Sequence, residues 1–429
     1  MATRKALPWQ AIGAAGYVQS SGYLAEGYVP ELRGEVGRKT LERMAKQSAP
    51  LAGAVYLVGQ QAKRADWGVE PAGHPRGAEA ADFLESALYD MESPWEDWAE
   101  ETMRLAVTFG WAASEPTYKI RAGYHPDVPG WDSRHADNRI GLRDLGQRHP
   151  LTLDRWDVDD AGQVLELVQR AAPDYRERRI PIERLVLHQI RANKGSPEGL
   201  SLLEGAYRAW YRVTTAEDLE LIGLERNVAG MVVLEVPPED LINADAYNRH
   251  KRFVRQLRVN ELMGAVIPAE EVRGQKTGYK LSLLSAAGTQ ASVADPIIRR
   301  EVGMMLSAFG AEYIRAGMDG VGARSFAETK LGALASATHG HLLALASTIN
   351  RQIVPELMQV NGFEPAAWPN ITVARPSDET LAELATFITA GVSAGIIAPQ
   401  DGDEDWWRAK ADMPARIVDA IDDNADTLE

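Results

Sequence analysis

Apolar residues recur at spacings of three and four along much of the chain, which is the pattern of helices with one buried face. Between residues 41 and 58, for example, Leu41, Met44, Val55 and Val58 fit this spacing and predict an amphipathic helix. Helices are therefore expected to dominate the fold. The same pattern predicts further helices over residues 79–88, 93–109, 202–229, 240–263, 293–315, 326–360 and 377–390.

The helix predicted at residue 93 has clear signals at both ends. Ser93 can cap the first turn, Pro94 suits the first helical position, and Glu96 follows three residues after the cap. Gly110 is expected to end the helix, because glycine readily adopts the left-handed conformation that follows a last turn. The segment therefore predicts a helix of about four turns.

Alternating polar and apolar residues, and short apolar runs bounded by turn residues, predict strands. Residues 151–158 and 163–168 alternate on both sides of an Asp/Gly-rich turn, which predicts a β-hairpin. Residues 121–148 are rich in Gly, Pro and Asp and are expected to form a polar loop. The predicted fold class is α+β and mainly α-helical. Other strands are predicted at residues 67–71, 111–120, 184–190, 231–237, 264–268, 278–284 and 371–374.

The composition narrows the possible functions. The 429 residues include no cysteine, which excludes disulfides, Cys-ligated metal sites and a thiol nucleophile. The length predicts two or three domains. No run approaches the roughly 18 apolar residues of a membrane span, and the first ten residues lack the apolar core of a secretory signal. We therefore expect a protein of the cytoplasm with no membrane partner.

The charge of the chain is acidic and unevenly distributed. Lys and Arg number 46 against 61 Asp and Glu, a net charge of −15. Residues 401–429 hold ten acidic residues against Arg408, Lys410 and Arg416, so this segment carries −7. The balance disfavours a protein that coats nucleic acid through a basic face, but it does not exclude one that lets nucleic acid pass. Trp406 and Trp407 in this acidic tail could dock on the parent domain or on a neighbouring subunit.

Motifs for chemistry are weak. His125, Asp127, Asp132, His135 and Asp137 gather in the predicted polar loop, but their spacing matches no defined metal site. The chain has no Gly-x-Ser-x-Gly and no His-Glu-x-x-His. The glycines between residues 317 and 322 are in the wrong order for a dinucleotide-binding loop. We therefore expect no metal, no cofactor and no enzymatic activity.

Five segments, taken in order, resemble the portal proteins (head–tail connectors) of tailed bacteriophages. The resemblance covers residues 41–376, and it rests on the order of the segments because none of them is a catalytic signature. The segments are the hairpin turn Trp156-Asp-Val-Asp-Asp-Ala-Gly162, residues 180–188, the Gly195-Ser-Pro-Glu-Gly199 stretch up to Trp210, residues 222–234, and Ser347 to Gly362.

The resemblance implies a division of the chain and a ring assembly. Residues 1–40 would be an N-terminal arm, 41–200 an α/β wing, 201–229 a helix leading to the stem, 230–288 the clip, 289–316 a stem helix, 317–325 the tunnel loop, 326–376 a long helix and strand, and 377–429 a small, acidic, crown-like region. The function implied is a dodecameric ring at one capsid vertex. It would be the channel for packaging and ejection of double-stranded DNA and the platform for head–tail joining.

The resemblance also implies partners and contact residues. The partners are further copies of the chain, the terminase large subunit, the major capsid and scaffolding proteins, a head–tail adaptor, and double-stranded DNA in transient, non-specific contact. The location would be the virion, with host cytoplasm during assembly. The tunnel-loop candidates are Arg315, Gly317, Met318, Asp319, Gly320, Val321 and Arg324, and the clip contact candidates are Arg252, Arg255, Arg258, Arg273 and Lys276.

Two other classes of protein fit the residues. One is an intracellular helical adaptor that binds a protein partner through residues 202–290. The other is an enzyme with its site in the polar loop at 121–148. Measuring the mass of the protein in solution would distinguish a ring from the adaptor and from the enzyme.

Overall fold

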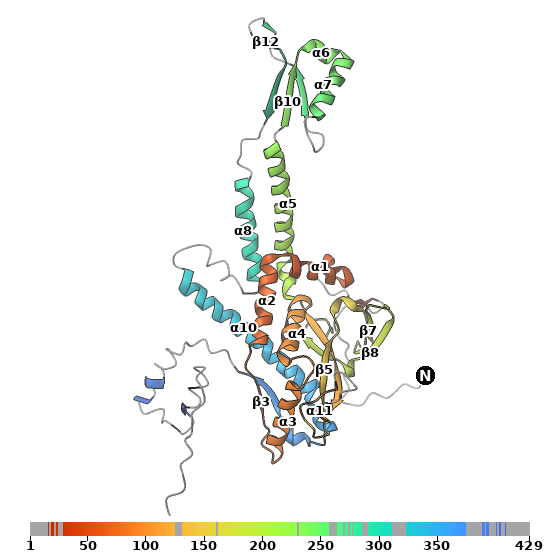
Figure 1. Ribbon diagram of the computed structural model, residues 1–429, viewed down its shortest axis with the longest axis vertical. Coiled ribbons are helices and arrows are strands. Elements are labelled where there is room, and N and C mark those ends of the chain that lie inside the picture. Colours follow the sequence, from red (N-terminus) through yellow and green to blue (C-terminus); the bar gives the residue numbers. More distant parts are fainter. Residues whose placement is uncertain are drawn as a thin grey trace, which may run out of the picture. The chain divides into compact units, whose positions relative to one another are not determined.

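The structure is a computed structural model and divides the chain into two compact units, residues 1–374 and 375–429. The described part of the first unit contains the elements considered below (Figure 1). The structure describes residues 16, 19–20, 23–24, 29–124, 131–159, 162–229, 231–256, 264–268, 271–272, 275–276, 278–284, 291–310, 323–374, 388–390, 392–393, 400, 403–404 and 408.

Four helices form the first part of the unit. The helix expected over residues 41–58 is two helices, α1 (Gly34–Gln47) and α2 (Ala49–Lys63), which follow the short 3₁₀ helix η1 (Pro30–Leu32). The break falls at Ser48, which is extended, because Pro50 in the first turn of α2 has no amide hydrogen and could not donate to the carbonyl of Lys46 in one continuous helix. α3 (Gly77–Tyr89) confirms the helix expected over 79–88.

α4 (Trp95–Phe109) confirms the helix predicted from residue 93 but corrects its beginning. Its N-cap is Pro94, no side chain caps it, and Ser93 lies outside. Its end is as predicted, since Gly110 has a φ of 89° and its amide donates to the carbonyl of Ala106. The capping signal therefore predicted the helix correctly, but the N-cap is Pro94, one residue after the predicted Ser93.

Three sheets complete the region around these helices. β4 (Trp111–Ile120) lies between β5 (Ile140–Gln147) and β9 (Val186–Gln189), antiparallel to both. β6 (Leu153–Val158), β7 (Val164–Arg170) and β8 (Glu177–Pro181) form a second antiparallel sheet, and the hairpin predicted over 151–168 is confirmed. β3 (Trp67–Glu70) pairs with β15 (Asn370–Val373), which joins residues 300 to 306 positions apart in the sequence. The remaining elements here are short. They are the paired strands β1 (Gln19–Ser20) and β2 (Tyr23–Leu24) and the 3₁₀ helices η2 (Pro150–Thr152) and η3 (Ile182–Arg184).

The expectation that residues 121–148 form one polar loop is wrong. β5 occupies its last third and pairs with β4 along seven residue pairs. Gly141, Asp144 and Gly146 weaken the strand signal of this segment, because glycine and aspartate are rare in strands. Pairing with the long strand β4 overrides that local preference.

The C-terminal part of the first unit is helical. α10 (Ala323–Gln352) and α11 (Val354–Val360) replace the single helix expected over 326–360, and the 3₁₀ helix η5 (Pro365–Ala367) leads into β15. The break at Ile353 comes just before Pro355, which lies in the first turn of α11. The side-chain amide of Asn361 donates from Nδ2 to the carbonyl of Ile140, so the end of α11 is tied to β5.

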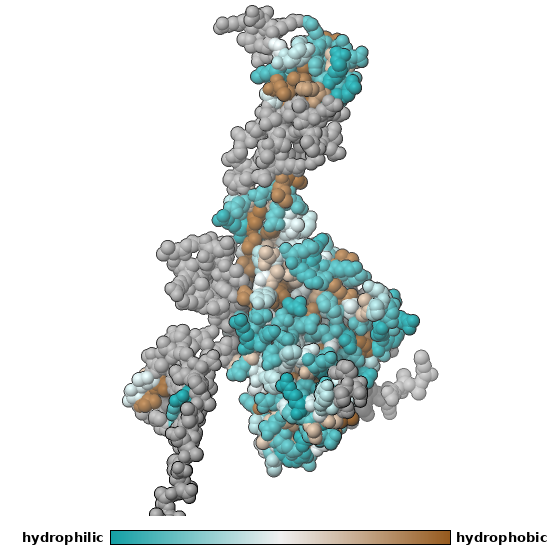
Figure 2. Space-filling view, in the orientation of Figure 1, coloured by the Kyte–Doolittle hydropathy of each residue, from teal (hydrophilic) through white to brown (hydrophobic). Residues whose placement is uncertain are grey.

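One large hydrophobic core unites these elements, and we call the part of the chain around it the main body. Trp95, Trp111 and Trp156 are fully buried in it. The Trp111 and Trp156 rings meet edge to face with 5.2 Å between their centroids, which is a favourable geometry for aromatic pairs. Figure 2 shows the visible surface of this region as largely hydrophilic. The core positions both the helices and the sheets.

Two helices and a small sheet follow the main body in the chain. The 3₁₀ helix η4 (Leu202–Ala206) leads into α5 (Tyr207–Ala229), and α8 (Ala291–Ser307) packs beside α5 (Figure 1). α8 ends eight residues before the predicted end at 315, and a turn at residues 308–310 follows it. No helix among the described residues is long and apolar enough to cross a membrane.

The chain between α5 and α8 folds as a separate small region, residues 231–284, which we call the small-sheet region. β10 (Met231–Val236) pairs in parallel with β11 (Gly264–Pro268) and antiparallel with β14 (Lys280–Leu284). β12 (Glu271–Val272) and β13 (Gln275–Lys276) pair with each other in antiparallel orientation. The helix expected over 240–263 is two helices, α6 (Pro238–Ile242) and α7 (Ala244–Gln256).

Candidate functional site

The α5–α8 pair is held together by apolar packing and by one buried acid. Ala209, Trp210 and Val213 of α5 face the core, as do Met305 and Leu306 of α8. Glu301 of α8 is 3% exposed. Its Oε1 accepts hydrogen bonds from Nη1 of Arg212 on α5 at 3.3 Å and from Nη2 of Arg300 at 2.9 Å. A buried carboxylate requires such partners, so Glu301 fixes the register of the two helices.

The base of α5 is anchored to the main body by backbone contacts. Ser201 Oγ donates to the carbonyl of Thr108 at 2.6 Å and accepts from the amide of Leu203 at 3.0 Å. A Cβ on Gly199 would lie 2.4 Å from the carbonyl oxygen of Gly110, so the two backbones meet where a side chain does not fit. These contacts join the first turn before α5 to the corner between α4 and β4.

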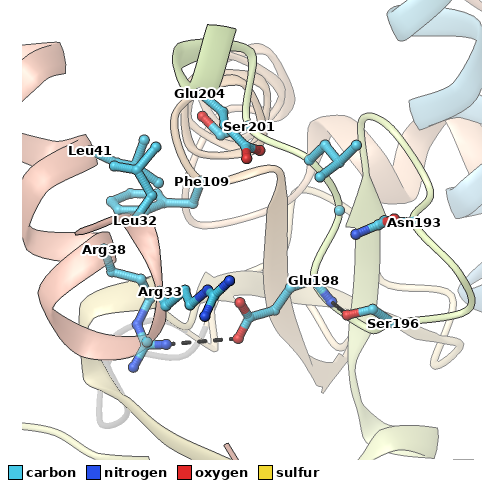
Figure 3. A pocket seen from close by; sticks show the side chains of 13 residues that line it. Leu32, Arg33, Arg38, Leu41, Phe109, Asn193, Ser196, Glu198, Ser201 and Glu204 are labelled. Carbon is cyan, nitrogen blue, oxygen red and sulfur yellow. Dashed lines mark hydrogen bonds and ion pairs between the residues drawn. The ribbon is translucent and has the colours of Figure 1, made fainter. Parts of the chain in front are cut away.

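A small pocket lies beside this anchor, between α1 and the segment at residues 193–204 (Figure 3). Arg38 of α1 and Glu198 face each other across it, with Nη1 of Arg38 3.7 Å from Oε1 of Glu198. Trp156 Nε1 donates to the same carboxylate at 3.0 Å, and Nη2 of Arg38 donates to the carbonyl of Leu153. Burial raises the pKa of Glu198, although the Arg38 charge and the Trp156 hydrogen bond act against the shift. This arrangement braces α1 against the base of α5.

The small-sheet region has a small core and a polar clasp. Leu234 and Val236 of β10 pack with Val254 of α7. Asp240 accepts from Tyr279 OH at 2.5 Å and lies 2.9 Å from Nε2 of His250. These two hydrogen bonds, the one from Tyr279 first, lower the pKa of the Asp240 carboxyl. The clasp ties α6 and α7 to the beginning of β14.

The structure places three of the clip contact candidates. Arg252 is exposed on α7, where its Nε donates to the carbonyl of Asn248, and Arg255 lies on the same helix. Lys276 is in β13. Arg258 and Arg273 lie outside the described residues. A basic helix is therefore present in this region, as expected, and its role as a contact stays a prediction.

The tunnel-loop candidates are mostly beyond what the structure describes. Arg324 lies in the first turn of α10, so the loop expected over 317–325 ends before Ala323. Ser325 and Phe326 already continue the helical pattern predicted over 326–360, and the sequence prediction of the loop missed this signal. The other candidates, Arg315, Gly317, Met318, Asp319, Gly320 and Val321, lie outside the described residues.

The enzyme hypothesis placed its site in the polar segment at 121–148. Where this segment is described, its charged residues make contacts that hold the main body together. Lys119 and Asp90 are both buried, and Nζ of Lys119 donates to the carbonyl oxygens of Asp90 and Asp132. Asp137 pairs with the buried Arg121 at 3.1 Å. Within the described residues, no three His, Asp or Glu side chains come together as a metal site. His125 and Asp127 are outside these residues.

Comparison with known protein families decides the family. A sequence model described as "Portal protein of Mu bacteriophage" matches residues 39–413, most of the chain. The chain belongs to this phage portal family. Portal proteins are structural proteins, so the enzyme hypothesis is set aside. No curated protein matches the portal chain.

Solved structures share the fold of this portal chain at low sequence identity. The "Neck of empty GTA particle computed with C6 symmetry" matches with a TM-score of 0.54 and 12% identity, over 88% of this chain and 94% of that chain. The "Virion of native gene transfer agent (GTA) particle" matches with a TM-score of 0.52, and the "Neck of native GTA particle computed with C12 symmetry" with 0.51, each at 11% identity and with the same two coverages. These likenesses establish a shared mixed helix–sheet fold.

The residues that build the described site were largely missed from sequence. Glu301 was passed over as one charge in an apolar pattern, although it occupies a core-facing position between Ile298 and Met305. A charged residue at a buried helical position signals a partner on the neighbouring helix. Arg38 and Glu198 had no such signal, because 160 residues separate them.

Proposed function

We propose that this protein forms a dodecameric ring at one vertex of a phage capsid. The ring would be the channel through which the terminase packages double-stranded DNA and through which DNA leaves, and the platform for head–tail joining. The observation that carries the proposal is the portal family match over residues 39–413. The similar structures described as a virion and as a particle neck with C12 symmetry support the ring and its place in the virion.

The division of the chain that we propose follows the described elements. The main body is the wing, α5 and α8 are the stem, and the small-sheet region is the clip, which receives the terminase large subunit during packaging and the head–tail adaptor afterwards. The major capsid and scaffolding proteins contact the ring in the host cytoplasm as the capsid assembles. Residues 317–322, which connect the stem to α10, form the tunnel loop, and residues 377–429 form a small acidic crown.

The charge of the chain suits passage of DNA. Each copy carries −15, so a ring repels a polyanion as a whole. Tight phosphate contacts would slow a duplex that has to move, because each neutralised phosphate adds to the affinity. Arg315 and Arg324 would supply weak, transient contacts near the tunnel loop.

The ring is tested by measuring mass in solution and imaging the particles. Purified protein examined by mass photometry and negative-stain microscopy is expected to give closed rings of twelve copies with a central hole. A stable monomer or dimer at micromolar concentration, at every salt concentration tested, would overturn the proposal and favour the helical adaptor.

The channel is tested separately by replacing residues 317–322 with a Gly/Ser segment of the same length. Rings are expected to assemble normally, while the amount of DNA packaged per particle falls. A Gly/Ser replacement of residues 171–176, the turn between β7 and β8 in the main body, serves as the control for a changed loop. Normal packaging by rings that carry the 317–322 replacement would contradict the tunnel-loop assignment.

A further inference from the structure

The α5–α8 pair exposes apolar side chains on the sides that face away from the core. On α5, Tyr211 is 59% exposed and Ile222 46%, and on α8, Ile297 is 37% exposed and Met304 60%. In Figure 2 hydrophobic residues are visible along this pair. Large exposed apolar side chains that gather on one element, rather than occurring singly, are typical of interaction surfaces.

Helical spacing places these residues on two defined faces. Residues 211, 218 and 222 of α5 are seven and four apart, so they lie on one face, opposite the buried residues 209 and 213. Residues 297, 300 and 304 of α8 are also three, four and seven apart and share a face. We call these the α5 outer face (Tyr211, Asp218, Ile222) and the α8 outer face (Ile297, Arg300, Met304).

The two outer faces carry opposite charges. The α5 outer face contains Asp218, and Glu217 is exposed beside it. The α8 outer face contains Arg300, whose side chain is 64% exposed even though it also pairs with Glu301. Each face is therefore apolar with one central charge, and the charges are complementary.

The two faces cannot meet within one subunit. α5 and α8 already pack through their opposite, buried sides. Because Arg212 of α5 donates to Glu301 of α8, these two residues lie at the same height along the helix pair. Because the helices run antiparallel, each residue further along α5 lies level with a residue one position earlier in α8. Asp218 is therefore level with residue 295 of its own subunit, five residues away from Arg300.

We infer that the α8 outer face of one subunit docks on the α5 outer face of the next copy around the ring. The inference rests on the proposed ring, and it specifies the contact between neighbours. A contact between two different faces repeats head to tail, and it closes into a ring when the rotation allows. Each subunit offers one face of each kind, as such a ring requires.

One register satisfies the charges and the apolar residues together. If Arg300 is level with Asp218 of the neighbour, Ile297 comes within one residue of the level of Ile222, and Met304 comes within one helical turn of Tyr211. This register differs by five residues from the one within a subunit. At 1.5 Å per residue the offset is about 7.5 Å along the helix axis, and because a closed ring has no rise along its own axis, the stem helices must be inclined to that axis.

Engineered cysteines test this register cleanly, because the chain has no cysteine of its own. In the double variant Ile222→Cys with Ile297→Cys, mild oxidation of the full-length protein is expected to give a ladder of covalent oligomers on non-reducing gels. The control is Arg208→Cys with Ile297→Cys. Arg208 is also exposed on α5 but lies about 20 Å away in this register, so no ladder is expected.

Charge reversal tests the same contact without cross-linking. Asp218→Arg is expected to reduce the ring fraction at least tenfold by mass photometry, because it sets a second cation against Arg300 of the neighbour, whereas the control Asp82→Arg on α3 is expected to leave the ring fraction unchanged. Both side chains are exposed, and circular dichroism at the wild-type level confirms that each variant is folded.

The outcomes separate this inference from the proposed function. Wild-type rings whose Ile222→Cys/Ile297→Cys variant gives no ladder, or an Asp218→Arg variant that forms rings at the wild-type level, would overturn the docking of these two faces and leave the ring intact. Wild-type protein that forms no ring would instead overturn the proposed function.

Discussion

The main body and the small-sheet region differ in what holds them together. The main body packs four helices, three sheets and α10 around one core that includes Trp95, Trp111 and Trp156. The small-sheet region buries Leu234, Val236 and Val254, with Leu241 and Val266 partly buried beside them. A three-stranded sheet under one helix has little apolar area to offset the entropy of folding. The main body is therefore held by a large shared core, and the small-sheet region by a small core of its own with a polar clasp beside it.

The largest effect is expected when the core of the main body is opened. Trp95→Ala should lower the free energy of unfolding by about 3–5 kcal/mol, because it removes a fully buried indole that contacts Trp67 and Trp98. Urea denaturation monitored by circular dichroism measures the change. Trp131→Ala is the matched control, since Trp131 is 40% exposed, and it should change the midpoint little. Equal effects of the two variants would contradict a core-dominated body.

The small-sheet region should respond locally to the corresponding change. Leu234→Ala removes a residue that is part of a three-residue core, at a typical cost of about 2–5 kcal/mol. Limited trypsin digestion should then cleave at Arg249, Lys251 and Arg252 of α7, while urea denaturation of the main body is unchanged. Leu281→Ala, on the same sheet but 53% exposed, is the control. A shift of the whole denaturation curve by Leu234→Ala would show that the two regions unfold together.

Acid should weaken the main body through His188. Burial, with a contribution from the charge on His341, lowers the pKa of His188 to about 4. The unfolded chain binds this proton near pH 6.5, so stability is complete above pH 6.5 and falls between pH 6.5 and 4, by up to about 3 kcal/mol. His188→Gln should flatten this part of the stability–pH curve and leave the curve above pH 7 parallel to wild type. An unchanged acid slope would show that His188 does not contribute.

The smallest effect is expected at the clasp of the small-sheet region. Tyr279→Phe removes the hydrogen bond to Asp240 and keeps the ring. Because the site is exposed, trypsin cleavage of α7 should rise only slightly, and less than with Leu234→Ala. Tyr247→Phe on α7 offers a comparable loss of a hydroxyl as control. Cleavage as fast as in Leu234→Ala would mean that the clasp, and not the small core, holds this region.

Periodicity alone predicted most of the elements and missed where they break. The strand over 111–120 and the helix over 93–109 are present nearly as expected, because one buried face repeats at regular spacing. The helices over 41–58 and 326–360 each proved to be two, since Pro50 and Pro355 change the direction of the chain without disturbing the apolar pattern. β5 was missed because its partner β4, and not its own composition, makes it a strand.

The candidate site likewise has parts that the sequence predicted and parts that it could not predict. The basic helix that carries Arg252 follows from the sequence, since its charges are consecutive and local. The Arg38–Glu198 pair and the Arg212–Glu301 bond could not be predicted, because they join residues 160 and 89 positions apart. Exposure of Tyr211 and Met304 was equally invisible, because an apolar residue in a helical pattern is by default assigned to the core.

The sequence by itself determined the element types, the acidic charge, the absence of cysteine chemistry and the resemblance to portal proteins, because each depends on residue identity and short-range spacing. The tertiary structure decided which apolar residues of α5 and α8 are buried and which are left for a partner. It also decided that Glu301 lies between two helices and that the small-sheet region has a core of its own. These features depend on which segments pack together, and packing is a property of contacts between residues far apart in the chain.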